Sequence, residues 1–61
     1  MMVSLGQNHT ARLRRRDGQL RVTVFNPHGI AIGLFELPQT VTVADAIRKA
    51  KEHVVELRGA P

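Results

Sequence analysis

Hydrophobic and polar residues alternate on both sides of Asp17-Gly18, a dipeptide typical of a two-residue β-hairpin turn. With this turn, Arg16 pairs with Gln19, and the pairing continues outward to Ala11 and Val24. Because successive side chains of a strand point to opposite sides of a sheet, one face of the hairpin is apolar. That face consists of Ala11, Leu13, Leu20, Val22 and Val24. The other face collects Arg12, Arg14, Arg16, Arg21 and Thr23.

A second hairpin turn is predicted at Asn26-Pro27-His28-Gly29. Asn at the first position and Pro at the second favour a type I turn, and Gly supplies a positive φ. If Gly29 forms a β-bulge, Asn26 pairs with Ile30 and the third strand continues the apolar face. In this register the apolar face gains Ile30, Ile32 and Leu34. A four-residue loop without the bulge would instead place there Ala31, Gly33 and Phe35. The apolar pattern favours the bulge, which leaves Phe25 and Phe35 on the arginine side.

A helix is expected after Leu37-Pro38, because proline cannot donate to a strand ladder. Thr42 and Asp45 fit a capping box that begins a helix over residues 43–57, and Gly59 provides a stop. The apolar residues of this segment recur at three and four positions and form one stripe. The stripe consists of Val43, Ala46, Ile47, Ala50, Val54 and Leu57.

These elements predict an α+β fold of order β-β-β-α, in which a three-stranded antiparallel sheet of two hairpins packs on one C-terminal helix. We expect one domain over residues 9–58, a flexible N-terminal arm over residues 1–8 and a tail over residues 59–61. A chain of 61 residues buries roughly 60% of its unfolded surface and is marginally stable. A homodimer therefore stays an open alternative.

The positive charge of the chain is concentrated in the first hairpin. Five of the nine Lys and Arg residues lie within residues 12–21, where Asp17 is the only acid, and the formal net charge is +4. Such a surface predicts a polyanionic partner, either duplex DNA or an acidic protein. Stacking on single-stranded bases is disfavoured, because the chain has no Trp or Tyr and only two Phe residues.

Other function classes find little support in the residues. The three histidines, His9, His28 and His53, lack ligand spacing, and there is no cysteine, so we expect no metal site. No nucleophile has a base beside it, and Asp45 is interpreted as a cap, so we expect neither an enzyme nor a cofactor. No apolar run approaches the ~20 residues of a membrane span, and residues 1–6 do not form a secretory signal. A cytoplasmic protein without a membrane partner is the expectation.

The candidate nucleic-acid-binding residues lie on the sheet face that the helix would leave bare: Arg12, Arg14, Arg16, Gln19, Arg21 and Thr23. Alternate strand residues are ~6.6 Å apart, close to the phosphate spacing along one nucleic-acid strand, and a sheet or ribbon can enter the major groove. No acid is expected among these arginines, and small Ala31 and Gly33 would permit close approach of the backbone. The alternative interpretation is that the arginines only protect strand edges from aggregation and that Gly33 marks a bend.

The string Ile32-Gly-Leu-Phe35, followed by a helix with Ala44-Asp-Ala-Ile-Arg-Lys-Ala50, resembles AP2-type DNA-binding domains. The architecture is also similar to the arm-binding domains of phage and transposon integrases. This resemblance implies a three-stranded sheet in the DNA major groove, backed by one helix. It implies Gly33 and Phe35 as scaffold and, by strand position, three DNA contacts: Arg12, Arg14 and Arg21. The strand tryptophans of the AP2 family are absent here, and the segment after Phe35 is longer.

Leu37-Pro38 followed by Thr42-Val-Ala-Asp-Ala-Ile-Arg-Lys-Ala-Lys-Glu52 is similar to a segment of HicB-type antitoxins. This likeness implies a domain that binds a protein, although no strand follows the helix and the acidic character of that family is missing. Small phage or plasmid inhibitors of nucleic-acid enzymes belong to the same class. The alternative function is therefore a protein-interaction module or inhibitor that docks through its basic face or a strand edge.

Overall fold

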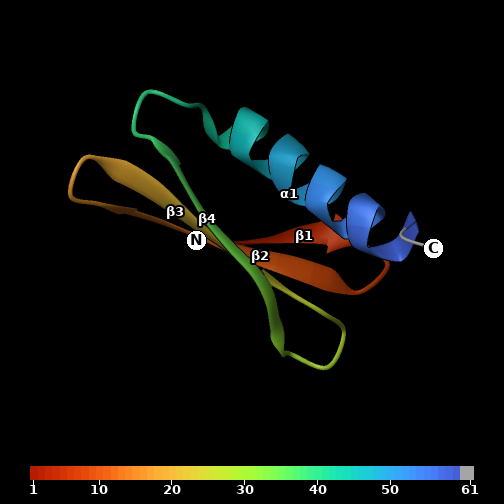
Figure 1. The fold of residues 1–61 in the computed structure, drawn as a ribbon. Helices are drawn as coiled ribbons and strands as arrows, with labels where there is room; N and C mark the ends of the chain where they lie inside the picture. The colour runs from red at the N-terminus through yellow and green to blue at the C-terminus, as the bar shows by residue number, and fades with distance from the viewer. Residues whose placement is uncertain (60–61) are drawn as a thin grey trace.

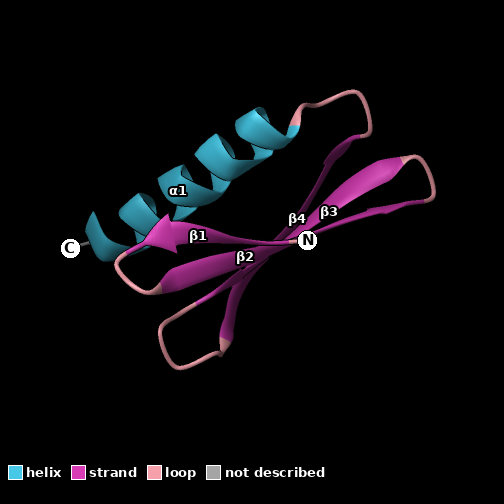
Figure 2. Cartoon of the chain, turned by 180° about the vertical axis from the view of Figure 1, so that it is seen from behind, coloured by secondary structure: helices cyan, strands magenta, loops and turns pink. Residues whose placement is uncertain are grey.

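The computed structural model describes residues 1–59, with the backbone alone for residues 56–59. The chain forms four strands and one helix: β1 (Met2–Gly6), β2 (His9–Arg16), β3 (Gln19–Phe25), β4 (Ala31–Pro38) and α1 (Val43–Gly59). The strands make one antiparallel sheet in the order β1-β2-β3-β4. Figures 1 and 2 show that the sheet is strongly twisted and that α1 covers one face. The predicted α+β class is confirmed, but the sheet has four strands and not three.

The additional strand, β1, occupies the segment that was expected to be an N-terminal arm. It pairs with β2, with Val3 opposite Ala11, and Leu5 is buried in the core. The connection to β2 uses positive φ angles at Gly6 and the two residues after it, a conformation that Gly and Asn adopt readily. The expectation of a flexible arm was therefore wrong for this segment. The apolar alternation of β1 covers too few residues to distinguish a strand from an irregular segment in the sequence.

The first hairpin has the predicted register throughout. Arg16 lies opposite Gln19, and the pairing continues to Ala11 opposite Val24. Asp17 and Gly18 have φ angles of 52° and 75°, and positive φ at both central residues is the mark of a type I′ turn. The twist of this turn matches the right-handed twist of the strands, which explains why a local signal sufficed here.

The second hairpin has the predicted turn but a different register beyond it. The Asn26 amide donates to the Ile30 carbonyl at 2.9 Å, and Gly29 has a φ of 79°. A further bulge follows, because Phe25 pairs with Ala31 but Val24 pairs with Gly33. Ile32 is the extra residue of β4.

This bulge corrects the predicted side of several β4 residues. Ile30 and Leu34, both expected in the core, are 61% and 62% exposed, whereas Phe35 and Leu37 pack against the core beside Ile32. Ile32 and Phe35 are three residues apart, so in a regular strand they would point to opposite faces. The extra residue in β4 lets both point toward α1, which neither of the two registers considered from the sequence allowed.

Gly33 also lies on the face covered by α1, and not on the open face as expected. A Cβ atom at Gly33 would lie 2.7 Å from Cδ2 of His53 and still closer to its Nε2. The half-buried His53 ring lies at 6.2 Å from the Phe35 ring, measured between centroids. Gly33 therefore provides the space that the α1 histidine occupies.

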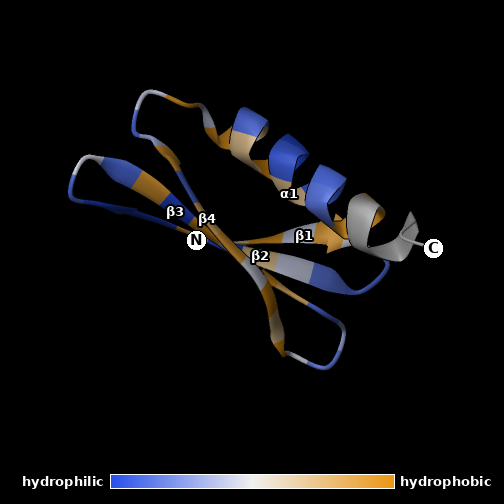
Figure 3. Ribbon diagram, in the orientation of Figure 1, coloured by the Kyte–Doolittle hydropathy of each residue, from blue (hydrophilic) through white to orange (hydrophobic). Residues whose placement is uncertain are grey.

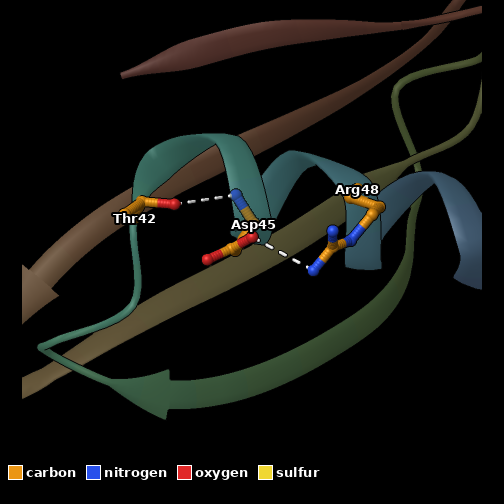
Figure 4. Close-up of polar contacts among 3 residues, drawn as sticks. All are labelled: Thr42, Asp45 and Arg48. Atoms are coloured by element: carbon orange, nitrogen blue, oxygen red, sulfur yellow. Dashed lines mark hydrogen bonds and ion pairs between the residues drawn. The ribbon is translucent and has the colours of Figure 1, made fainter.

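The helix begins with the predicted cap and ends later than expected. Thr42 Oγ1 accepts a hydrogen bond from the Asp45 amide at 3.1 Å, as Figure 4 shows. The Asp45 carboxylate accepts a hydrogen bond from Arg48 at 3.0 Å, and among the described residues no reciprocal bond from the Thr42 amide to the Asp45 carboxylate is found. The helix extends to Gly59 and not to 57. The rest of the expected tail, residues 60–61, lies outside the described residues.

The core lies between the sheet and α1, which packs mainly on β1, β2 and β3. The sheet contributes the largest fully buried side chains, Leu20, Val22 and Val24. The helix contributes Ala46, Ala50 and Val54, so small alanines face the sheet and let the helix approach closely. Figure 3 shows the resulting division, with hydrophilic residues on the outer side of the first turns of α1. The side chain of Leu57, which was predicted in the stripe, lies outside the described part.

Candidate nucleic-acid interface

The predicted binding residues share the sheet face opposite α1, which we call the open face. They form three cross-strand pairs, every second pair of the β2–β3 hairpin. The pairs are Arg12 with Thr23, Arg14 with Arg21, and Arg16 with Gln19. All four arginines are exposed. The alternation of the hairpin thus brings together the residues that the sequence singles out.

Arg14 and Arg21 place two positive charges directly opposite each other, and Glu36 lies on the other side of Arg21. Like charges directly opposite each other in an antiparallel sheet are destabilising. Within the described part of the chain, neither residue forms an ion pair. An anion between the two guanidinium groups would relieve this repulsion and accept charge-assisted hydrogen bonds from both.

A hollow of about 440 Å³ lies among the arginines of the hairpin. Its lining consists of Arg12, Arg14, Arg15, Arg16, Arg21, Thr23 and Leu34. Sequence reasoning missed Arg15, because its Cα pairs with Leu20 on the apolar side. Its guanidinium donates to the Gln39 carbonyl at 2.9 Å, which ties the hairpin to the segment before α1.

Strand β4 contributes to the open face in a way that the sequence did not predict. Leu34 lies opposite Thr23, and Glu36 lies opposite Arg21. The expectation that no acid accompanies the arginines was therefore wrong. The bulge at Ile32 is the reason, since it exchanges the faces of the residues that follow it. Ala31 stays on the open face, opposite Phe25.

Arg12 is restrained more than the other arginines of the open face. Its guanidinium carbon lies 5.3 Å from the centroid of the Phe25 ring, within the range of a cation–π interaction. Arg16 lies 3.7 Å from Asp17, but both side chains are largely exposed, so water and salt screen this pair. On the open face, Arg12 thus has a guanidinium held against an aromatic ring, whereas the contact of Arg16 is screened.

The three histidines lie in separate parts of the fold. Among residues 1–55, whose side chains are described, no cluster of three or more His, Cys, Asp or Glu residues could hold a metal ion. His9 contacts the Gln7 carbonyl at 3.0 Å, His28 lies in the second turn, and His53 packs beneath the sheet beside Gly33.

Over the described residues, no helix has the length and apolar character needed to cross a bilayer.

Comparison of the chain with protein-family models, curated proteins and solved structures found no match. The resemblances to AP2-type, integrase arm-binding and HicB-type domains stay predictions from the sequence.

Proposed function

We propose that the chain is a small nucleic-acid-binding module that binds duplex DNA through the open face. The observation that carries this proposal is the facing pair of Arg14 and Arg21 within an arginine-lined hollow. A protein that used these residues only for solubility would gain nothing from placing two positive charges opposite each other. A polyanion bound between the two guanidinium groups would offset their repulsion and accept hydrogen bonds from both.

The dimensions of the hairpin support a duplex as the ligand. β2 carries an arginine of the open face at every second residue, at Arg12, Arg14 and Arg16. The Cα atoms of neighbouring arginines in this set are therefore ~6.6 Å apart. This spacing suits successive phosphates of one backbone strand, and Gln19 and Thr23 add hydrogen-bonding groups beside them. The hairpin is the central pair of strands of the four-stranded sheet, so these arginines project from the middle of the open face, the part that would face a major groove ~12 Å wide.

The test is fluorescence anisotropy of a labelled random-sequence duplex, titrated at several salt concentrations. The first variant changes Arg12, Arg14, Arg16 and Arg21 to Gln. If these four residues neutralise phosphates, the slope of log K against log salt should become shallower by up to about 3.6, at about 0.9 per phosphate. Circular dichroism must first confirm that the variant is folded.

A matched pair of double variants separates the open face from net charge. Arg14→Gln with Arg21→Gln removes two positive charges from the open face, and Lys49→Gln with Lys51→Gln removes two from exposed positions of α1. We expect the first to reduce the salt slope by about 2 and the second to change it little. Equal effects, or no duplex binding by the unchanged protein, would refute the proposal.

The free edge of β4 favours a second candidate function, binding of a protein partner. β4 forms the end of the sheet, with β3 on one side and no strand on the other among the described residues. An extended peptide could add a strand there, with Leu34 exposed beside it. This function would be favoured if the unchanged protein binds no duplex, and if the variant with four Arg→Gln changes still binds a partner protein.

A further inference from the structure

Leu34 is an apolar residue within a basic hollow. It is 62% exposed and lines the hollow together with five arginines. Exposed in this way, its side chain contributes little to the core, and contact with phosphate groups would desolvate those anions without a hydrogen bond in return. Its position suits a ligand that presents an apolar group close to its phosphates.

Arg12 lines the same hollow as Leu34. Both Arg12 and Leu34 lie opposite Thr23, one from β2 and the other from β4. Their backbones are therefore two strand spacings apart, about 9.6 Å, and both side chains line the hollow. The Phe25 ring restrains the Arg12 guanidinium, which lowers the conformational entropy that ordering it on a ligand would cost.

We infer that Leu34 and Arg12 read bases in the major groove, Leu34 contacting the methyl group of a thymine and Arg12 the acceptor edge of a guanine beside it. This inference rests on the proposed function and makes it more specific. In B-form DNA the thymine methyl group is the apolar feature of the major groove, and arginine binds guanine O6 and N7 bidentately. The phosphates on either side would then be contacted by the other arginines of the open face, Arg14, Arg16 and Arg21.

The same assignment makes DNA, and not RNA, the ligand. Uracil lacks the methyl group that Leu34 would contact, and the major groove of A-form RNA is too deep and narrow for side chains to read. The phosphate contacts alone would not distinguish the two polymers. Preference for thymine is therefore the property that separates base reading from simple charge attraction.

The test compares three labelled duplexes by anisotropy: an alternating TG·CA DNA, the same DNA with deoxyuridine for every thymine, and the same DNA with 7-deazaguanine for every guanine. We expect the unchanged protein to bind the thymine duplex about three- to fivefold more tightly than the deoxyuridine duplex, the effect of one buried methyl group. Removal of N7 should weaken binding about fivefold or more. An RNA duplex of the corresponding sequence should bind more weakly than all three.

Each residue has a matched control: Ile30, just before β4, for Leu34, and Arg14, on the same strand, for Arg12. Leu34→Ala should abolish the preference for thymine over uracil, whereas Ile30→Ala, which removes a similarly exposed residue outside the hollow, should keep it. Arg12→Gln, which removes the guanidinium that would donate to guanine N7, should abolish the sensitivity to 7-deazaguanine. Arg14→Gln should keep that sensitivity, since Arg14 is assigned to phosphates.

The outcomes distinguish failure of the inference from failure of the proposed function. Equal affinity of the unchanged protein for thymine and uracil duplexes, with binding that still needs the arginines, would overturn base reading alone. Retention of the thymine preference in Leu34→Ala would overturn the role of Leu34. Absence of binding to any duplex would instead refute the proposed function itself.

Discussion

Replacement of Gly33 by alanine tests the packing of α1 against β4. Alanine normally stabilises a strand by about 0.5–1 kcal/mol relative to glycine. The φ angle of Gly33 is not positive, so the backbone gives no reason for a penalty. Here the new Cβ atom would lie 2.7 Å from Cδ2 of His53, so the His53 ring must move away from the Phe35 ring and the Ile32 carbonyl that it contacts. Because a side chain and not the backbone moves, we expect a cost near the lower end of the ~1–3 kcal/mol typical of overpacking, and a net destabilisation of about 0.5 kcal/mol for Gly33→Ala.

The measurement is urea denaturation followed by circular dichroism, for Gly33→Ala, His53→Ala and the double variant. Without the His53 ring, the same Gly33→Ala change should stabilise by about 0.5 kcal/mol or more. The sign of the effect thus reverses, which corresponds to a coupling energy of about 1–3 kcal/mol between contacting residues. If Gly33→Ala is neutral or stabilising while His53 is present, the space beneath the ring does not limit this position and the reasoning fails.

Three further changes test other elements. Leu5→Ala should cost about 2–5 kcal/mol in urea denaturation because Leu5 is a core residue of β1; an effect near zero would mean that β1 does not pack in solution. Thr42→Ala should cost about 1 kcal/mol through loss of the cap, with Thr42→Ser nearly neutral as the control. Asp17→Asn keeps a residue suited to the type I′ turn but removes an acid beside Arg16, so thermal stability should stay the same while duplex affinity rises at low salt; weaker duplex binding would contradict the assignment of this face.

The parts of the fold that could be predicted depend on local signals. The Asp17-Gly18 turn and the alternation around it determine which residues of the hairpin face α1, and the structure has that register. The Thr42 cap and the helical stripe likewise place α1 from short-range patterns. In each case the same few residues specify both the backbone conformation and the buried face. Local preferences and tertiary packing therefore favour the same structure.

The parts that could not be predicted depend on contacts between distant segments. The bulge at Ile32 lets Ile32 and Phe35 both pack against the core, and the apolar pattern of β4 shows that these residues are out of phase but does not place an extra residue between them. β1 gains its stability from pairing with β2 and from Leu5 in the core. For the candidate site, the arginines of the hairpin were placed correctly, but Leu34 and Glu36 were missed because the bulge decides their side.

The order of the strands has a consequence for how fast the chain folds. Every strand pairs with the strand next to it in the sequence, so each hairpin closes a short loop at low entropic cost. Proteins dominated by such local contacts fold rapidly, and the β2–β3 hairpin, with its tight turn, is the expected nucleus. The contact of α1 with β1 joins the segments most distant in sequence and should form late. In stopped-flow experiments, Leu5→Ala should therefore accelerate unfolding more than it slows folding.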